Sequence, residues 1–174
     1  MSFLQEKIRT LSRVVDQVNL VAQFICYRLL EIIVIVIVLQ VVLRFVFNSP
    51  TKWSEEAAMI SLVWFGMLAV AIGVRRHRHI AITFFRDLLP PRGGLVLDIF
   101  AQLMILAFAL ILITNGSELM AIAGKTRLPA SQIPKIYLYL SAMTGGLLMA
   151  INAITNLLAG PLNDNQNTES ETNS

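Results

Sequence analysis

The sequence predicts an all-α integral membrane protein with four transmembrane helices and an N-terminal amphipathic interfacial helix. Hydrophobic residues make up 56% of the 174 residues, only 14% are charged, and the mean hydropathy is +0.68. Ordinary soluble domains contain about 25% charged residues. Residues 57–74 carry no charge, and about 20 apolar residues in a helix cross the roughly 30 Å bilayer core. The chain is therefore expected to span a membrane several times.

Residues 1–22 predict a separate amphipathic helix at the cytoplasmic membrane surface. Its apolar residues recur at spacings of three and four, which places them on one helix face, and charged residues occupy the rest. They are Leu4, Ile8, Leu11, Val15, Val18 and Ala22. The segment lacks the compact apolar region of a signal peptide. We expect the helix to lie on the membrane surface, and packing on a partner is the alternative.

Residues 23–160 are expected to form the transmembrane domain, with spans at about 26–47, 56–75, 95–119 and 133–159. The β-branched run at 32–38 would suit a strand in water. In lipid a helix is favoured, because its backbone satisfies its own hydrogen bonds. Residues 161–174 are polar and are expected to form a disordered cytoplasmic tail.

The distribution of Lys and Arg predicts that both termini are cytoplasmic. Nine basic residues lie near the termini side of the predicted spans and five lie near the opposite side. An excess of basic residues marks the cytoplasmic side of a membrane protein. Arg75, Arg76 and Arg78 follow the second span and are expected to hold the topology and bind anionic lipid headgroups.

Charged residues within the predicted spans need partners or access to the membrane surface. Glu31 follows Arg28 by three residues, so a same-face ion pair near the cytoplasmic end of the first span is expected. Arg44 lies near the outer end of that span. It could extend to the surface or pair with Glu55 or Glu56, and both possibilities remain open.

Ser54 is predicted as the N-cap of the second span. The carboxylates of Glu55 and Glu56 would then lie in the first turn, where they complement the positive end of the helix dipole. An ion pair that reaches another subunit is the functional alternative for these two carboxylates.

No catalytic, metal-binding or cofactor-binding residues are predicted, and the chain is not expected to be an enzyme. His77 and His79 lie in an arginine-rich segment, which disfavours a cation. Cys26 is the only cysteine, so it cannot form an intrachain disulfide. No residue pair suggests a nucleophile and its base, because the base would have to be one of these histidines.

Small residues in the fourth span predict close helix packing. Ser141 and Gly145 are four residues apart, as are Gly146 and Ala150. Such spacing lets helix backbones approach closely in lipid. Contact within the chain's own bundle is favoured over contact with another protein. No substrate-binding residue is evident in the spans, so the chain is interpreted as part of a larger assembly.

Several short motifs, in this order, resemble the small membrane subunit of tripartite ATP-independent periplasmic (TRAP) transporters, the DctQ family. They are the run 42–48, Trp53-Ser54-Glu55-Glu56, Trp64, Gly66, Arg75-Arg76, His79-Ile80 and Leu89-Pro90-Pro91. The resemblance covers roughly residues 29–155. Residues 81–83 are Ala-Ile-Thr, where the family often has an acidic residue.

The resemblance implies a scaffold in a bacterial inner-membrane transporter. In such a system a large multi-span permease subunit carries the substrate and sodium sites, and a periplasmic substrate-binding protein delivers organic acids such as dicarboxylates, keto acids or sialic acid. Neither a cofactor nor a nucleic acid is implied for the small subunit. The residues implied to stabilise the fold or the subunit interface are Arg44, Trp53, Glu55, Glu56, Trp64 and His79.

Two other classes remain as alternatives from the sequence. One is a membrane-anchor subunit of a respiratory or other redox complex, which a haem spectrum would support. The other is a free-standing membrane enzyme, which would show activity without partners.

Overall fold

The computed structural model describes residues 2–49, 51–76, 91–123 and 125–172. These residues form four long helices, α1 (Ser2–Phe45), α2 (Lys52–Arg76), α4 (Pro91–Ala123) and α5 (Ile136–Thr172). Each helix contains an apolar stretch long enough to cross a membrane. The predicted all-α integral membrane fold with four spans is confirmed.

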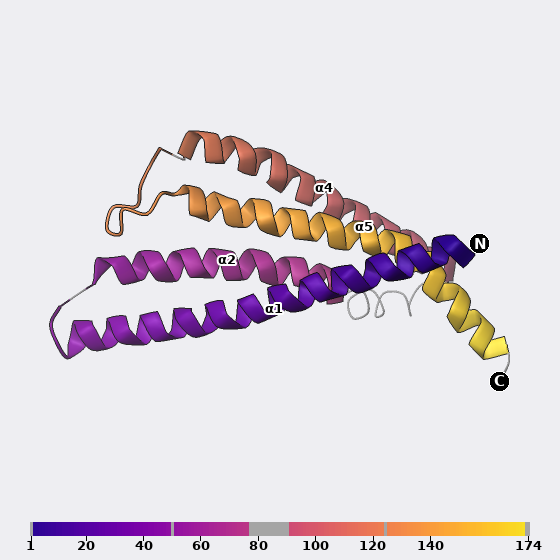
Figure 1. Cartoon of the computed structure of the whole chain (residues 1–174), viewed down its shortest axis with the longest axis horizontal. Coiled ribbons are helices and arrows are strands. Elements are labelled where there is room, and N and C mark those ends of the chain that lie inside the picture. The colour runs from indigo at the N-terminus through magenta and orange to yellow at the C-terminus, as the bar shows by residue number, and fades with distance from the viewer. Residues whose placement is uncertain (1, 50, 77–90, 124, 173–174) are drawn as a thin grey trace.

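The four helices lie side by side in the order α1, α2, α5, α4 (Figure 1). Both chain ends lie at one end of the bundle, and the α1–α2 and α4–α5 connections lie at the other. An even number of spans requires this arrangement if all four cross the same bilayer. We call the two ends the termini end and the loop end.

The first helix does not divide near residue 22. α1 is one uninterrupted helix of 44 residues, about 66 Å long at 1.5 Å per residue. No glycine or proline occurs in residues 1–45, so nothing in this stretch favours a break. Val15 and Ala22, from the predicted apolar face, are buried in the bundle. This segment therefore continues the first helix without a break and packs partly on its own chain, and its place at the membrane surface stays a prediction.

The other helices also extend beyond the predicted limits, except that α5 begins at Ile136, three residues after the predicted start. α2 begins at Lys52, and α4 begins at Pro91, where a missing backbone N–H is tolerated. α5 continues as helix through Thr172, beyond the start of the tail predicted at 161–174, and the cytoplasmic location of that tail stays a prediction. A proline such as Pro161 removes one helical hydrogen bond and favours a bend. Figure 1 shows the yellow end of α5 turning away from the bundle.

Small residues let α5 fit between α2 and α4. A Cβ atom added at Gly145 would lie 2.9 Å from the Cβ of Met67 on α2. A Cβ added at Gly146 would lie 3.1 Å from the Cβ of Leu112 on α4. Ser141 and Ala150, the other two residues predicted for packing, are buried as well. The small-residue stripe of α5 thus contacts the chain's own helices on two sides.

The connection between α4 and α5 folds into a short hairpin. The backbone N–H of Lys135 donates to the Thr126 carbonyl at 3.0 Å, and the Leu128 N–H donates to the Ile133 carbonyl at 2.9 Å. Gln132 adopts a positive φ of 58° at the turn. These bonds present the backbone of residues 130–131 toward the start of α2.

Candidate functional site: an anchored loop, a polar network and an exposed ion pair

Glu56 anchors the hairpin at the loop end. Its two carboxylate oxygens accept hydrogen bonds from the backbone N–H groups of Ala130, at 2.8 Å, and Ser131, at 2.7 Å. The Ser131 hydroxyl donates a third bond to the same carboxylate. Glu56 is 8% exposed, so its charge is balanced mainly by these donors. The carboxylate fastens the α4–α5 connection to α2.

Ser54 is not the N-cap that the sequence predicts. α2 begins two residues earlier, at Lys52, so Thr51 occupies the N-cap position. The fully buried Ser54 hydroxyl donates to the Thr51 carbonyl at 2.7 Å and lies 2.9 Å from the Thr51 hydroxyl. These contacts between Ser54 and Thr51 stabilise the first turn of α2.

Arg44 forms no ion pair with either carboxylate in the described part of the chain. Glu55 instead accepts a hydrogen bond from Gln40 at 3.1 Å, which joins α1 to α2. The Arg44 guanidinium lies 5.7 Å from the centre of the Phe45 ring. Of the two open possibilities, pairing with a carboxylate is not observed, because Glu56 is already occupied by the hairpin.

An open groove of about 950 Å³ lies at the loop end. Charged side chains of both signs line it, together with the hairpin backbone. They belong to Arg44, Lys52, Glu55 and Glu56, beside Phe45, Asn48, Pro129 and Ala130. The groove gathers three of the residues for which the family resemblance implies an interface role.

The two tryptophans differ in their surroundings. Trp64, near the middle of α2, donates its indole N–H to the Tyr137 carbonyl at 3.0 Å and thus links α2 to the start of α5. Trp53 is 46% exposed in the first turn of α2. That position suits an aromatic side chain at a membrane–water interface.

Arg75 holds three helices together at the termini end. Its guanidinium donates to Asp16 at 2.8 Å and Ser12 at 2.6 Å on α1, and to Asn156 at 2.8 Å on α5. The side chain is 13% exposed. The donors of Arg75 are thus directed into the protein rather than toward solvent, and its predicted role in topology or headgroup binding stays a prediction.

The other basic residues of this segment are only partly described. Arg76 is exposed and donates to the Gln23 side chain on α1 at 2.7 Å. The predicted sites Arg78 and His79, and also His77, lie outside the described residues. Among the residues that the structure does describe, no group of His, Cys, Asp or Glu could hold a metal ion.

A buried amide pair lies next to the Arg75 contacts. The side chains of Asn19 and Asn152 donate to each other at 2.7 and 2.9 Å. Asn152 also donates to the Ala71 carbonyl on α2 at 2.8 Å, and it has no exposed surface. Asn19 is not among the residues that were singled out from the sequence. The available signal was a polar residue four positions after Val15, on the apolar face of the helix.

The Arg28–Glu31 ion pair is present at 2.7 Å, but its depth differs from the prediction. The neighbouring Cys26 thiol contacts the Phe65 carbonyl at 3.9 Å, and Phe65 is the fourteenth of the 25 residues of α2. The pair thus lies near the middle of the bundle rather than at its cytoplasmic end. Both side chains are more than half exposed. An isolated charge at this depth costs about 2.5–3.5 kcal/mol on insertion scales.

These features define a multi-pass helical membrane subunit whose polar side chains mainly join its own helices. Residues 33–160 match the family of tripartite ATP-independent periplasmic transporters, DctQ component. The chain belongs to this family and is a TRAP transporter small permease subunit. The family consists of transporter components rather than enzymes.

Individual relatives carry related names. A Haemophilus influenzae protein that bears the name of a TRAP transporter small permease is 25% identical over 142 residues, covering 82% of this chain and 88% of the relative. The sialic acid TRAP transporter small permease SiaQ of Vibrio cholerae is 30% identical over 89 residues, or 51% of each chain.

A longer relative also contains a similar segment. The sialic acid TRAP transporter permease SiaT of Haemophilus influenzae is 33% identical over 81 residues, which are 47% of this chain and 13% of SiaT. A segment similar to this chain can therefore occur within a much larger permease.

Proposed function

We propose that this chain is the scaffold for the large permease subunit of a sodium-coupled secondary transporter of organic acids. The observation that carries the proposal is a set of hydrogen bonds at two levels of the bundle. Glu56 holds the α4–α5 hairpin to α2 at the loop end, and Asn152 and Arg75 join α1, α2 and α5 toward the termini end. Helices that are joined by hydrogen bonds at two levels are expected to move as one rigid body. This property suits the stationary part of a transporter better than its moving part. Sodium and substrate would then bind to the large subunit.

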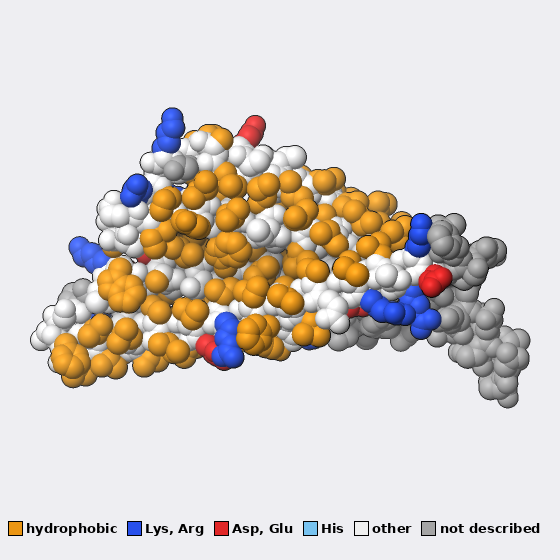
Figure 2. All heavy atoms as spheres, in the orientation of Figure 1, with side chains coloured by type: hydrophobic (Ala, Val, Ile, Leu, Met, Phe, Trp, Pro, Cys, Tyr) orange, Lys and Arg blue, Asp and Glu red, His pale blue; other side chains and the backbone are white. Residues whose placement is uncertain are grey.

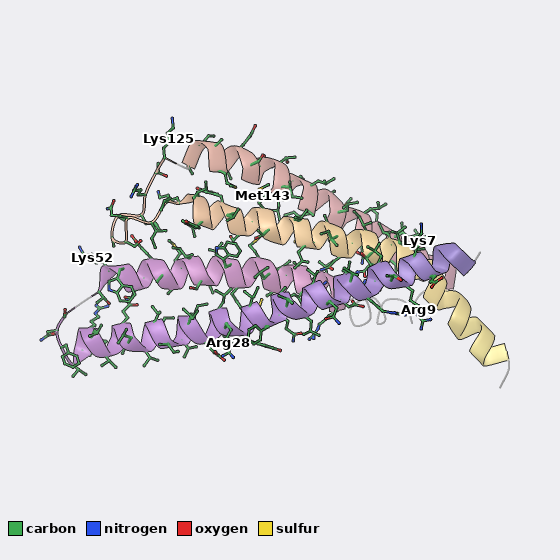
Figure 3. The ribbon with its side chains drawn as sticks, in the orientation of Figure 1. Lys7, Arg9, Arg28, Lys52, Lys125 and Met143 are labelled. Atoms are coloured by element: carbon green, nitrogen blue, oxygen red, sulfur yellow. The ribbon has the colours of Figure 1, made fainter. Side chains whose placement is uncertain are left out.

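The proposed assembly lies in the bacterial inner membrane with both termini of this chain in the cytoplasm. Lys7 and Arg9 lie at the termini end, and Lys52 and Lys125 lie at the loop end (Figure 3). The excess of Lys and Arg near the termini side of the sequence supports the cytoplasmic location of that end. The loop end with the Glu56 hairpin would face the periplasm. There a periplasmic substrate-binding protein would deliver the substrate to the assembly.

The proposed substrate class rests on the names of relatives. SiaQ of Vibrio cholerae is named for sialic acid, and the small permease DctQ of the same organism is named for C4-dicarboxylates. Both substrates are carboxylates, so we propose an organic acid for this transporter. The redox-anchor alternative is not favoured by the family match.

Co-purification with the large permease subunit tests the proposal. The tagged chain is isolated from native membranes in mild detergent, and stoichiometric recovery of a multi-span permease is expected. Recovery of the chain alone, or with a haem-bearing complex, would overturn the assignment of partners.

The variant Glu56→Ala tests the scaffold role. Because the hairpin loses its anchor, we expect less large subunit per tagged chain, with substrate preference unchanged. Glu118→Ala on α4 is the matched control, since Glu118 is an exposed carboxylate outside the groove. Normal co-purification of Glu56→Ala together with an altered substrate profile would contradict the proposal.

A further inference from the structure

One exposed stripe of α1 has the spacing of a helix–helix contact. Its residues alternate at intervals of four and three, the heptad pattern by which two helices pack along a shared seam. They are Phe24, Arg28, Glu31, Ile35, Val38, Val42 and Phe45, and we call them the α1 seam. Every member is exposed, from 40% at Val42 to 75% at Phe45. No described part of this chain covers the seam.

Three contacts between α1 and α2 set the depth of the seam. They are Gln40 with Glu55 at the loop end, Cys26 with Phe65 near the middle, and Asp16 with Arg75 at the termini end. Arg28 and Glu31 follow Cys26 by two and five residues. The ion pair therefore lies beside the centre of the charge-free stretch 57–74 of α2.

The ion pair faces outward from the bundle at this depth. Figure 3 shows Arg28 midway along α1, and Figure 2 shows a red and blue cluster at that place among orange hydrophobic side chains. In the described structure Arg28 donates one bond to Glu31 and lies 5.0 Å from the centre of the Phe24 ring. A guanidinium has five N–H donors, and the bilayer core offers no water to accept the others.

We propose that the α1 seam is the contact surface for a transmembrane helix of the large permease subunit. That helix places a hydrogen-bonding side chain or carbonyl group opposite the Arg28–Glu31 pair, and its apolar residues pack on Ile35 and Val38. The inference rests on the proposed function, because it names the surface through which the scaffold binds its partner. The internal match to SiaT agrees with a large permease as the occupant.

The opposite edge of the bundle differs in character. α4 lies farthest from α1 (Figure 1), and its exposed side chains near mid-helix are apolar, as at Met104 and Ile111. Such a surface is compatible with lipid tails, because it brings no charge to that depth. Charge at membrane depth therefore distinguishes the seam from an ordinary lipid-facing helix.

Site-specific photocross-linking in the assembled transporter tests the inference. p-Benzoylphenylalanine replaces Ile35 or Val38 on the seam, and Met104 or Ile111 on α4 as matched controls of similar exposure. After irradiation of membranes, we expect adducts with the large subunit to be at least tenfold more abundant at the seam positions. Equal or lower yields at the seam than at α4, in a complex that still co-purifies, would overturn the inference alone.

Other outcomes of the same experiment also decide between occupants. Adducts between two copies of this chain at Ile35 would assign the seam to a homodimer and overturn the proposal. Loss of the seam adducts because no large subunit co-purifies with the unmodified chain would instead overturn the proposed function. The two failures are thus distinguishable.

A charge variant provides a second test. Arg28→Leu leaves Glu31 without its partner at the seam, so the large subunit recovered per inserted chain is expected to fall at least fivefold. Met104→Leu on α4 is the control and should leave the ratio unchanged. If Arg28→Leu lowers only the amount of inserted chain and leaves the ratio intact, the pair faces lipid and the inference is wrong.

Discussion

Gly145→Ala tests the close approach of α5 to α2. The added Cβ would lie 2.9 Å from the Met67 Cβ and 3.1 Å from the Met67 carbonyl oxygen. Carbon atoms pack best at about 3.5–4.0 Å, so the helices must separate or distort. Overpacking of this kind costs about 1–3 kcal/mol, and the better helix propensity of alanine returns at most about 1 kcal/mol. We therefore expect a net loss of up to about 2 kcal/mol.

Gly66→Ala is the matched control on α2. No atom lies within 4 Å of a Cβ added at Gly66, so only the propensity gain of up to about 1 kcal/mol applies there. One kcal/mol shifts the melting temperature by about 2–4 °C in a chain of this size. Thermal unfolding in mild detergent, followed by circular dichroism, should therefore show a lower Tm for Gly145→Ala and an equal or higher Tm for Gly66→Ala. Equal stabilisation of both variants would refute the packing argument.

Three further variants test the polar contacts. Asn152→Ala leaves its amide partner on α1 and the Ala71 carbonyl unsatisfied, so the free energy of unfolding should fall by about 1–3 kcal/mol; an unchanged denaturation curve would contradict this. Glu56→Gln removes the charge that holds the hairpin, so amide hydrogen exchange at residues 130–131 should accelerate, whereas Glu55→Gln should leave it unchanged. Arg75→Gln breaks the bonds to both α1 and α5, so proteolysis within the first 16 residues of α1 should be faster, and wild-type resistance would argue against the contact.

Much of the architecture could be read from residue patterns. The predicted span limits at the loop end, residues 47, 56, 119 and 133, lie within four residues of the observed helix ends, because lipid requires long stretches without charge. At the termini end α1 and α5 continue beyond the predicted spans, into residues 1–22 and beyond Pro161, where polar residues continue a helix. Hydrophobic patterns do not determine where such a helix ends, because the backbone hydrogen bonds of a helix can continue through residues that have no apolar face.

The side-chain contacts were less accessible to sequence reasoning. The Arg28–Glu31 pair follows from spacing along one helix, and it is observed. The partners of Arg75 and Glu56 are remote in the sequence, with Asp16 separated from Arg75 by 59 residues and Ser131 from Glu56 by 75. Without the tertiary arrangement, charge and position favoured the lipid headgroups for Arg75 and the positive helix end for Glu56, with a pairing to Arg44 left open.

The sequence by itself determined that this chain crosses a membrane, that it does so as helices, and that it resembles a transporter subunit. Hydrophobic length and internal backbone hydrogen bonding decide the first two properties locally, whereas the resemblance rests on the order of short motifs. Only the tertiary structure decided the depth of the Arg28–Glu31 pair and the helices that Arg75 joins. The depth of an ion pair and the partners of a side chain depend on how neighbouring helices align along their length. That alignment is a property of the packed bundle rather than of any one segment.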